Sequence, residues 1–297
     1  MSGPFELTLG LDLRPQTTGA IAYALWMCET AGLHASGHVH PVHVIEPDVM
    51  VELIRYADEA TILGAYRQRG KEQLDELGHS AHFHAPEVFG GDAVEILEER
   101  ARAEGSTALL ISRRAARETA LAFPRLGAVA RRLLRRLKVP VIVTPPDLLP
   151  SHVGDGPILV AVDFEDGSAR AVAWAKQIGD TLNRAVVLVH LAEMPDQLGY
   201  AGFIQSERWE ALATEILDRG RERMGQFLRA HALDDGGVEN VVVRGPVLPG
   251  LLDYAVTRKA CMIVCGSGHH GVLHRIIVPS IASEAAALAS VPVAVVP

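Results

Sequence analysis

The feature that most constrains this chain is an internal repeat. Residues 128–145 align without a gap with residues 280–297, so the segment VPVIVTP (139–145) returns at the end of the chain as VPVAVVP (291–297). A run of residues with helical periodicity precedes each of these segments. Such a repeat predicts two copies of one structural unit, because each copy has to bury the same pattern of apolar residues.

Two further landmarks occur in the same order and at nearly the same spacing. They are LTLGLDL (7–13) with ILVAVDF (158–164), and VHVIEPD (42–48) with VHLAEMPD (189–196). We therefore predict a duplication, with one domain over residues 1–147 and a second over residues 155–297. The segment 145–157, rich in proline, glycine and aspartate, is the predicted linker. A length of 297 residues suits two domains of ordinary size.

The second half alternates short apolar runs with segments of helical periodicity. The predicted strands cover residues 158–164, 185–193, 240–245, 261–266 and 291–296, and the predicted helices cover 168–182, 207–230, 248–258 and 280–288. Nearly continuous apolar strands that alternate with helices are typical of a parallel sheet with helices on both faces. The predicted fold class is therefore α/β, as two tandem, doubly wound domains of five parallel strands each.

Charge and composition exclude several classes of protein. Thirty-six acidic against 28 basic residues give a net charge of −8, the opposite sign to most nucleic-acid-binding proteins. The stretch 276–296 is the most apolar, but its two prolines and a glutamate do not suit a membrane span. The first residues lack the pattern of a signal peptide. We expect a cytoplasmic protein that binds neither membranes nor specific nucleic acid.

The three cysteines, Cys28, Cys261 and Cys265, do not form a disulfide framework. An odd number without regular spacing argues against a secreted, disulfide-stapled domain and indicates a reducing compartment. Cys261 and Cys265 lie on one predicted strand, where their spacing puts both on the same face about 13 Å apart, too far for a disulfide. We expect both thiols to pack in the core.

The ends of the predicted strands hold polar residues from which a site can be built. In parallel α/β sheets, ligands bind at the carboxyl ends of the strands. A carboxylate there accepts hydrogen bonds from a ribose or an amine, and glycines let backbone N–H groups approach phosphates. In the second half the first strand ends in Ala161, Val162 and Asp163, the second in His190 and Leu191, and the fourth in Gly266, Ser267, Gly268, His269 and His270.

Ser280 would add its hydroxyl and the positive end of a helix to the same place. Taken singly, these residues also fit plainer roles. Asp163 suits a turn or a helix cap, and His190 suits a partly buried, packed histidine.

The combination resembles the universal stress protein family. The resemblance extends over both halves and rests on Asp163, the His190–Leu191 pair, the glycine loop after the fourth strand and the terminal VPVAVV strand. It implies a Rossmann-like fold of the adenine nucleotide alpha hydrolase type, a role in the stress response and no catalysis. In nucleotide-binding members the ligand is ATP or AMP, with Mg²⁺, and the loop reads Gly-x-x-Gly, nine residues, then Gly-Ser or Gly-Thr.

The second half matches this loop only in part. Gly266 takes the first glycine position, His269 replaces the second glycine, and Pro279 replaces the glycine before Ser280. Proline offers no N–H to a phosphate, whereas a protonated histidine would donate to one. The resemblance implies a nucleotide site made of Ala161, Val162, Asp163, Leu191, Gly266, Ser267, Gly268, His269, His270, Ser280 and Ile281.

The first half departs further from the pattern. Its fourth predicted strand, 108–112, runs into the arginine-rich segment 113–117, which contains no glycine, although Asp12 and His43 remain at the strand ends. Without glycines the backbone cannot approach phosphates as closely. We therefore expect no nucleotide in this half.

Residues 113–138 contain nine lysines and arginines but a single acidic residue, Glu118. This composition is typical of a solvated helix face whose charges match the acidic domain beside it. The alternative is an anion site, or a docking surface for an acidic partner or nucleic acid.

Other motifs predict less. The run Gly266–Gly271 fits the dinucleotide fingerprint G-x-G-x-x-G, but that motif belongs after the first strand and here follows the fourth. No spacing among the histidine-rich stretches matches a structural zinc site. These stretches contain His38, His40 and His43, and His79, His82 and His84. No nucleophile, base and orienting group come together, so we expect no enzyme.

Two alternatives to a nucleotide-binding stress protein stay open, a nucleotide-free interaction module and a weak ATPase or dinucleotide-binding enzyme. Members of the family commonly dimerise through the last strand. The resemblance thus implies that 139–145 and 291–297 pair within one chain as a pseudo-dimer, since both are apolar and would otherwise be exposed edges. A homodimer of whole chains also stays open.

Overall fold

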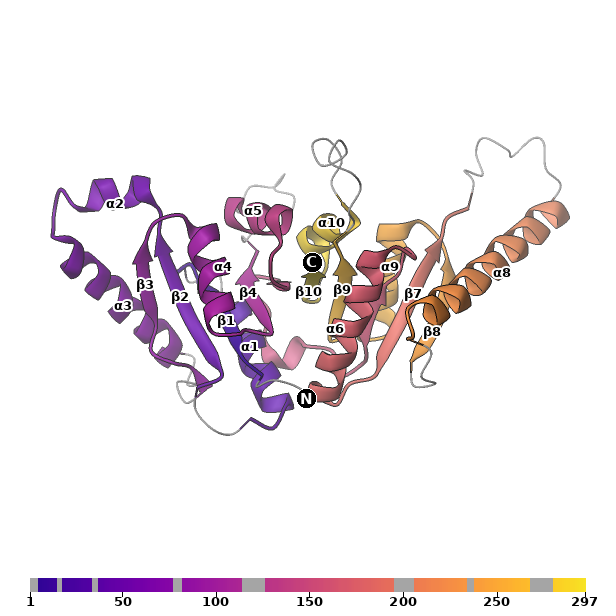
Figure 1. Cartoon of the computed structure of the whole chain (residues 1–297), viewed down its shortest axis with the longest axis horizontal. Coiled ribbons are helices and arrows are strands. Elements are labelled where there is room, and N and C mark those ends of the chain that lie inside the picture. The colour runs from indigo at the N-terminus through magenta and orange to yellow at the C-terminus, as the bar shows by residue number, and fades with distance from the viewer. Residues whose placement is uncertain are drawn as a thin grey trace.

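The protein folds around a single sheet of ten strands (Figure 1). A computed structural model describes residues 5–14, 18–33, 37–76, 82–113, 126–194, 206–233, 238–267 and 280–297, to which the structural statements refer. The strands are β1 (Leu7–Leu11), β2 (Val39–Ile45), β3 (Glu87–Gly90), β4 (Ala108–Ser112), β5 (Val141–Thr144), β6 (Ile158–Ala161), β7 (Val186–Ala192), β8 (Glu239–Arg244), β9 (Met262–Gly266) and β10 (Val293–Val296).

Helices cover both faces of this sheet. They are α1 (Gly19–Thr30), α2 (Pro47–Leu53), α3 (Glu59–Glu76), α4 (Ala93–Ala103), α5 (Ala128–Arg136), α6 (Asp166–Leu182), α8 (Ser206–Ala230), α9 (Val247–Thr257) and α10 (Ile281–Leu288). A short 3-10 turn, η2 (Pro150–His152), lies between β5 and β6. No helix in the described part of the chain is long and apolar enough to cross a membrane.

The same strand order occurs twice in the sheet. The order is β3-β2-β1-β4-β5-β10-β9-β6-β7-β8, so each half arranges its own strands as third, second, first, fourth and fifth. Neighbouring strands within a half are parallel, whereas β5 and β10 pair antiparallel. The predicted α/β class, with five parallel strands in each half, is confirmed.

The predicted elements of the second half are present, but the first strand is shorter than expected. β6 ends at Ala161, so Val162 and Asp163 lie in the loop, and α6 begins earlier than predicted, at Asp166. The cause is a tight turn at Phe164, whose φ of +69° is left-handed and cannot continue a strand.

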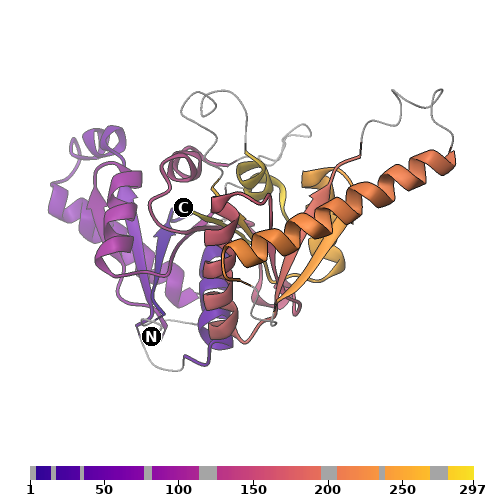
Figure 2. The same cartoon turned by 45° about the vertical axis from the view of Figure 1, so that its right-hand side comes forward.

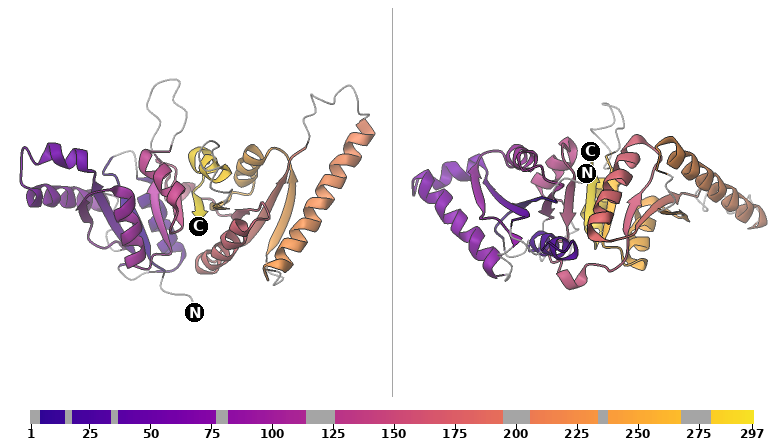
Figure 3. Two further views of the ribbon diagram at one scale, coloured as in Figure 1. Left: turned by 45° about the horizontal axis from the view of Figure 1, so that its top comes forward. Right: turned by 60° about the horizontal axis from the view of Figure 1, so that its bottom comes forward.

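Apolar side chains of the described residues form two large clusters, one on each face of the sheet, and a small third cluster of Ile45, Ile62 and Val88. The first joins the strands to α1, α6 and α8, and includes Met27, Ile178 and Phe227. The second joins them to α4, α5, α9 and α10, and includes Leu133 and Ala285. Each cluster contains residues of both halves, and Figures 2 and 3 show the halves side by side, with α8 reaching beyond the sheet. The two halves therefore share one core.

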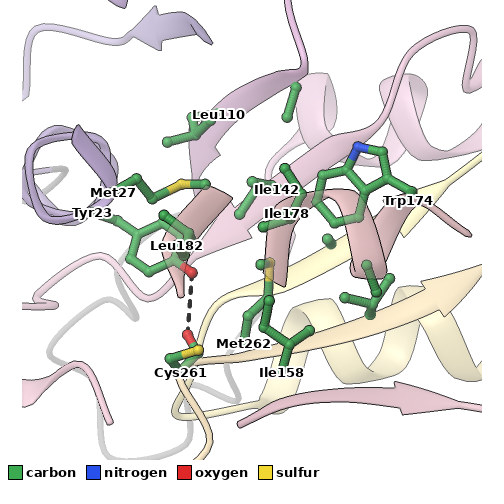
Figure 4. Packing of buried hydrophobic residues seen from close by; sticks show 14 of the residues in the cluster. Tyr23, Met27, Leu110, Ile142, Ile158, Trp174, Ile178, Leu182, Cys261 and Met262 are labelled. Carbon is green, nitrogen blue, oxygen red and sulfur yellow. Dashed lines mark hydrogen bonds between the residues drawn. The ribbon is translucent and has the colours of Figure 1, made fainter. Parts of the chain in front are cut away.

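Two polar contacts cross the seam where α1 faces α6. The hydroxyl of Tyr23 donates to the carbonyl oxygen of Cys261 at 3.1 Å (Figure 4). The indole N–H of Trp174 donates to the carbonyl oxygen of Thr107 at 3.2 Å. Buried hydroxyl and indole groups cost free energy unless they are hydrogen-bonded, so these contacts favour one arrangement of the two halves.

The cysteines are buried and free, but one expectation about them is wrong. Cys261 packs in the cluster of α1 and α6, and Cys265 packs in the cluster on the opposite face. Cys261 lies in a bend before β9, which breaks the alternation on which the predicted shared face depended. Burial raises the pKa of Cys28, Cys261 and Cys265 to about 12, so all three are poor nucleophiles.

In each half, a histidine of the second strand makes the same hydrogen bond to the backbone at the end of the first strand. Nδ1–H of His43 donates to the carbonyl oxygen of Leu11, and Nδ1–H of His190 donates to that of Val162, both at 2.8 Å. Burial is the main cause that lowers the pKa of each ring below its ordinary value of 6.5. Both residues are therefore packed, neutral histidines at pH 7.

Truncation of Ile142 tests whether the halves share one core. Ile142 is fully buried in β5, opposite Ala294 of β10. Ile142→Ala leaves a cavity at the seam and should lower the free energy of unfolding by about 2–5 kcal/mol, with the chain still unfolding in one transition. Urea unfolding followed by circular dichroism and by tryptophan fluorescence measures this. The control is Leu149→Ala, an exposed position, with an expected change under about 0.5 kcal/mol. Two separate transitions would contradict a shared core.

The pH dependence of stability tests the histidine bond of the first half. Because folding lowers the pKa of His43, the unfolded chain binds the proton more readily, and stability falls as the pH drops through 6.5. His43→Asn keeps an N–H donor but does not titrate, so its stability should fall less between about pH 7.5 and 5.5. Urea unfolding of both proteins over this range measures the difference. If the stability of the two proteins changes equally with pH, His43 binds its proton as well in the folded chain as in the unfolded chain.

Candidate functional site

The turn after β6 places Asp163 at the carboxyl end of the sheet. Oδ1 of Asp163 accepts hydrogen bonds from the Ser168 hydroxyl at 2.6 Å and from N–H of Glu165 at 3.0 Å. N–H of Asp163 in turn donates to Oγ of Ser168 at 3.0 Å. Asp163 is nevertheless exposed. One carboxylate oxygen shapes the turn, as in the plainer of the two predicted roles, while the side chain still reaches solvent.

Of the two residues near the tip of β7, Leu191 was predicted to belong to the site, and it lies on the opposite face of the sheet from His190. The ring of His190 lies on the side of α8, with its centroid 4.3 Å from that of Phe164, and the guanidinium of Arg223 lies 4.5 Å from the same Phe164 ring. Leu191 packs on the opposite face, in the cluster of α9 and α10, and is 6% exposed. Leu191 thus offers little surface to an adenine ring.

Gly266 is required at the end of β9 by packing. A Cβ at this position would overlap the backbone of Gly167 at the start of α6. The next residue, Ser267, donates its N–H to the carbonyl oxygen of Val296 at 2.7 Å, which ties β9 to β10. Only glycine fits so close to another backbone, whether or not a phosphate lies beside it.

The last helix begins where the sequence predicts. Ser280 is the N-cap of α10, and its Oγ accepts a hydrogen bond from N–H of Ser283 at 3.2 Å. Ser280 is exposed, and Ile281 is 38% exposed. The first N–H groups of a helix have no partner within it, so this end of α10 offers donors to an anion.

The structure brings part of the predicted site together. β6 lies between β9 and β7, and Gly266 contacts the start of α6, so the strand tips that carry Asp163 and Gly266 adjoin. Ala161 and Val162 lead into the same turn, whereas Leu191 packs on the other face. The remaining predicted residues of the loop, Gly268, His269 and His270, lie outside the described residues.

Ion pairs cross the corresponding edge of the first half. Arg132 of α5 donates to Oδ2 of Asp92 at 2.6 Å and to Oε1 of Glu46 at 2.9 Å. Asp92 caps α4 after β3, and Glu46 follows β2. One guanidinium thus links the ends of two strands to α5, a contact that we call the Arg132 clamp. The sequence gives no direct sign of it, because its three residues lie far apart along the chain.

Carboxylates of the first half match much of the basic segment. Besides the Arg132 clamp, Arg136 pairs with Glu95 at 3.4 Å and Lys138 with the buried Glu98 at 3.1 Å. The predicted face of matched charges is present in the described residues. These carboxylates belong to the same half and not to the adjoining domain as expected, whereas Arg113 at the start of the segment bonds to backbone carbonyl oxygens of the second half.

The two histidine-rich stretches meet at the amino end of β2. The ring of His40 stacks on that of His84 with centroids 4.2 Å apart, and the Glu6 carboxylate binds His38 and His40 at 3.3 and 3.1 Å. His40 and His84 border a cavity of about 570 Å³ beside β2 and β3 of the first half, whereas the predicted nucleotide site lies in the second half. No three metal-ligating side chains among the described residues are placed to hold a metal ion.

Comparison with known proteins agrees with this architecture. The model of the universal stress protein family matches residues 7–145 and again residues 156–297. A universal stress protein from Archaeoglobus fulgidus DSM 4304 aligns with a TM-score of 0.57 at 19% identity, over 98% of this chain and 97% of that chain. A functionally unknown protein from Pseudomonas aeruginosa PAO1 aligns with a TM-score of 0.60 at 17% identity, over 98% of this chain and 92% of that chain. No curated protein matches the chain.

At these identities the two solved structures support the fold alone. The family model adds the sequence pattern and matches each half separately, over most of its length. The chain therefore belongs to the universal stress protein family, with the family unit present twice in tandem.

Proposed function

We propose that this protein is a non-enzymatic, cytoplasmic stress-response protein that binds one adenine nucleotide, ATP or AMP with Mg²⁺, in its second half. A ribose hydroxyl or the exocyclic amine of adenine would donate a hydrogen bond to the exposed Asp163 carboxylate. The phosphates would lie at the start of α10, beside Ser280 and the first N–H groups of the helix.

The described residues fit such a ligand. Asp163 is exposed at a strand tip that adjoins Gly266, and Ser280 is exposed at a helix start. A carboxylate acceptor for the nucleoside and N–H donors for the phosphates are the two kinds of group that a nucleotide needs. Leu191 fits less well than the resemblance implies, because its side chain is nearly buried.

A difference between the halves carries the proposal. The repeat places Glu284 at the position of Arg132, and the N-cap of α9 is Pro246 where α4 has an aspartate. Among the described residues of the second half the Arg132 clamp therefore has no counterpart, and no such ion pair links the carboxyl ends of its strands to α10. We infer that the first half has lost its nucleotide site and that the second half has kept one.

Nucleotide binding is tested on protein as purified and then on stripped protein. Denaturation and chromatography should release ATP or AMP, and calorimetric titration of stripped protein should give one site per chain. Glu284 lies in the first turn of α10, so its charge repels phosphates and we expect chelation of Mg²⁺ to weaken binding. Empty protein with no thermal shift at millimolar ATP-Mg²⁺ would favour a nucleotide-free interaction module. Recovered NAD or flavin, or steady release of phosphate from ATP, would favour an enzyme.

The duplication supplies a matched control for the nucleoside contact. Asp163→Ala should weaken nucleotide binding about tenfold or more, because it removes a charged hydrogen-bond acceptor. Asp12→Ala makes the same change at the equivalent turn of the first half and should leave the affinity unchanged. Calorimetric titration of the two variants measures this, with circular dichroism to confirm that both are folded. If Asp12→Ala weakens binding and Asp163→Ala does not, the site has been assigned to the wrong half.

A further inference from the structure

A single arginine of the first half contacts the last helix of the second half. Arg113 directly follows β4, and its N–H donates to the carbonyl oxygen of Thr144 at 3.0 Å, which fixes its backbone beside β5. Its Nη1 donates to the carbonyl oxygens of Ala287 and Ala289, both at 2.8 Å. These two carbonyls lie at the carboxyl end of α10, whose other end begins after Ser280.

The carboxyl end of α10 has no cation of its own. The helix has eight residues and carries no basic residue in its last turn. The last carbonyls of a helix have no partner within it, and a cation near them opposes the negative end of the helix dipole. Arg113 supplies both the donors and the charge. So short a helix depends on such tertiary contacts, since it is not stable by itself.

This dependence runs in one direction between the two halves. The equivalent helix of the first half, α5, carries Arg135 and Arg136 in its own last turn. The residue after β9 that corresponds to Arg113 is Ser267, whose side chain is too short to span such a distance. The duplication therefore leaves α5 with its own cations, whereas α10 takes its cation from the other half.

We propose that Arg113 is a positioning residue for the nucleotide site of the second half, an inference that rests on the proposed function. It holds α10 by its carboxyl end, so that the amino end presents Ser280 and the first N–H groups to the phosphates. Burial lowers the pKa of Arg113 and the nearby Asp147 raises it, but a guanidinium stays charged at neutral pH. Arg113, the first residue of the segment that takes the place of the glycine loop in the first half, thus serves the site of the second half.

The test compares ATP with adenosine. Arg113→Met keeps the apolar stem but removes the charge and the donors, and should weaken ATP binding about three- to tenfold. Adenosine binding should not change, because α10 contacts only the phosphates. Arg113→Lys should recover part of the loss. Arg135→Met, an exposed arginine in the first half, removes the same charge and should leave both affinities unchanged.

Hydrogen exchange of α10 without nucleotide is the second measurement. The amides of its last turn should exchange faster in Arg113→Met than in the wild type or in Arg135→Met, because the carbonyls at that end lose their donors. This measurement does not need a ligand. It also shows whether the variant is folded, since the strands of the seam should keep their protection.

The outcomes separate this inference from the proposed function. If the wild type binds ATP and Arg113→Met binds it equally well, the inference is wrong and the proposed function stands. Equal loss of ATP and adenosine affinity would also overturn it, because it would indicate general damage to the second half. If the wild type binds neither ligand, the proposed function fails. In that case, if α10 exchanges equally fast in Arg113→Met and in the wild type, Arg113 does not stabilise α10 either. Faster exchange in Arg113→Met would still show that Arg113 stabilises the carboxyl end of α10.

Discussion

The antiparallel pair of β5 and β10 determines where the other elements lie. In each half the fifth strand would otherwise be an exposed apolar edge, and such edges tend to pair with other chains. Pairing within the chain joins the five parallel strands of each half into one sheet of ten strands. As a result, each of the two large apolar clusters contains residues of both halves. It brings α1 against α6, where Tyr23 and Trp174 bond across, and it brings the end of β4 within reach of α10. A contact such as that of Arg113 can exist only because this strand pair fixes the two halves relative to each other.

A shared core also allows two copies of one unit to differ at their strand tips. Neither half can lose its fold without exposing the seam of the other, so selection for stability acts on both. The strand tips are under no such constraint. In the first half the tips of β2 and β3 have become a network of ion pairs around Arg132, which stabilises the edge but occupies it. In the second half Asp163 and Ser280 are exposed at the corresponding edge, and Asp12, the first-half equivalent of Asp163, is exposed too.

Much of the fold could be predicted from the sequence, because buried parallel strands read as apolar runs and the repeat gives each of them twice. What failed depends on local geometry or on distant contacts. β6 stops at Ala161 because Phe164 adopts a left-handed turn, and Cys261 faces away from Cys265 because a bend precedes β9. The sequence also predicted that Asp163 follows the first strand of the second half and that the last helix starts at Ser280, and the structure has both in these positions. Gly266 is required because the backbone of Gly167 lies so close to it. This requirement and the partners of Arg132 and Arg113 depend on tertiary contacts, which spacing along the chain does not predict.

The contact between Arg113 and α10 makes any nucleotide site in the second half a property of the whole chain. Coupling between two contacts is reciprocal, since free energy depends only on the states and not on the order in which they form. If Arg113 stabilises the form of α10 that holds phosphates, then phosphates at the start of α10 must stabilise the contact with Arg113 to the same extent. Arg113 is also the first residue of the arginine-rich segment 113–117. A nucleotide at the start of α10 would thus also stabilise the position of Arg113, at the end of β4 in the first half.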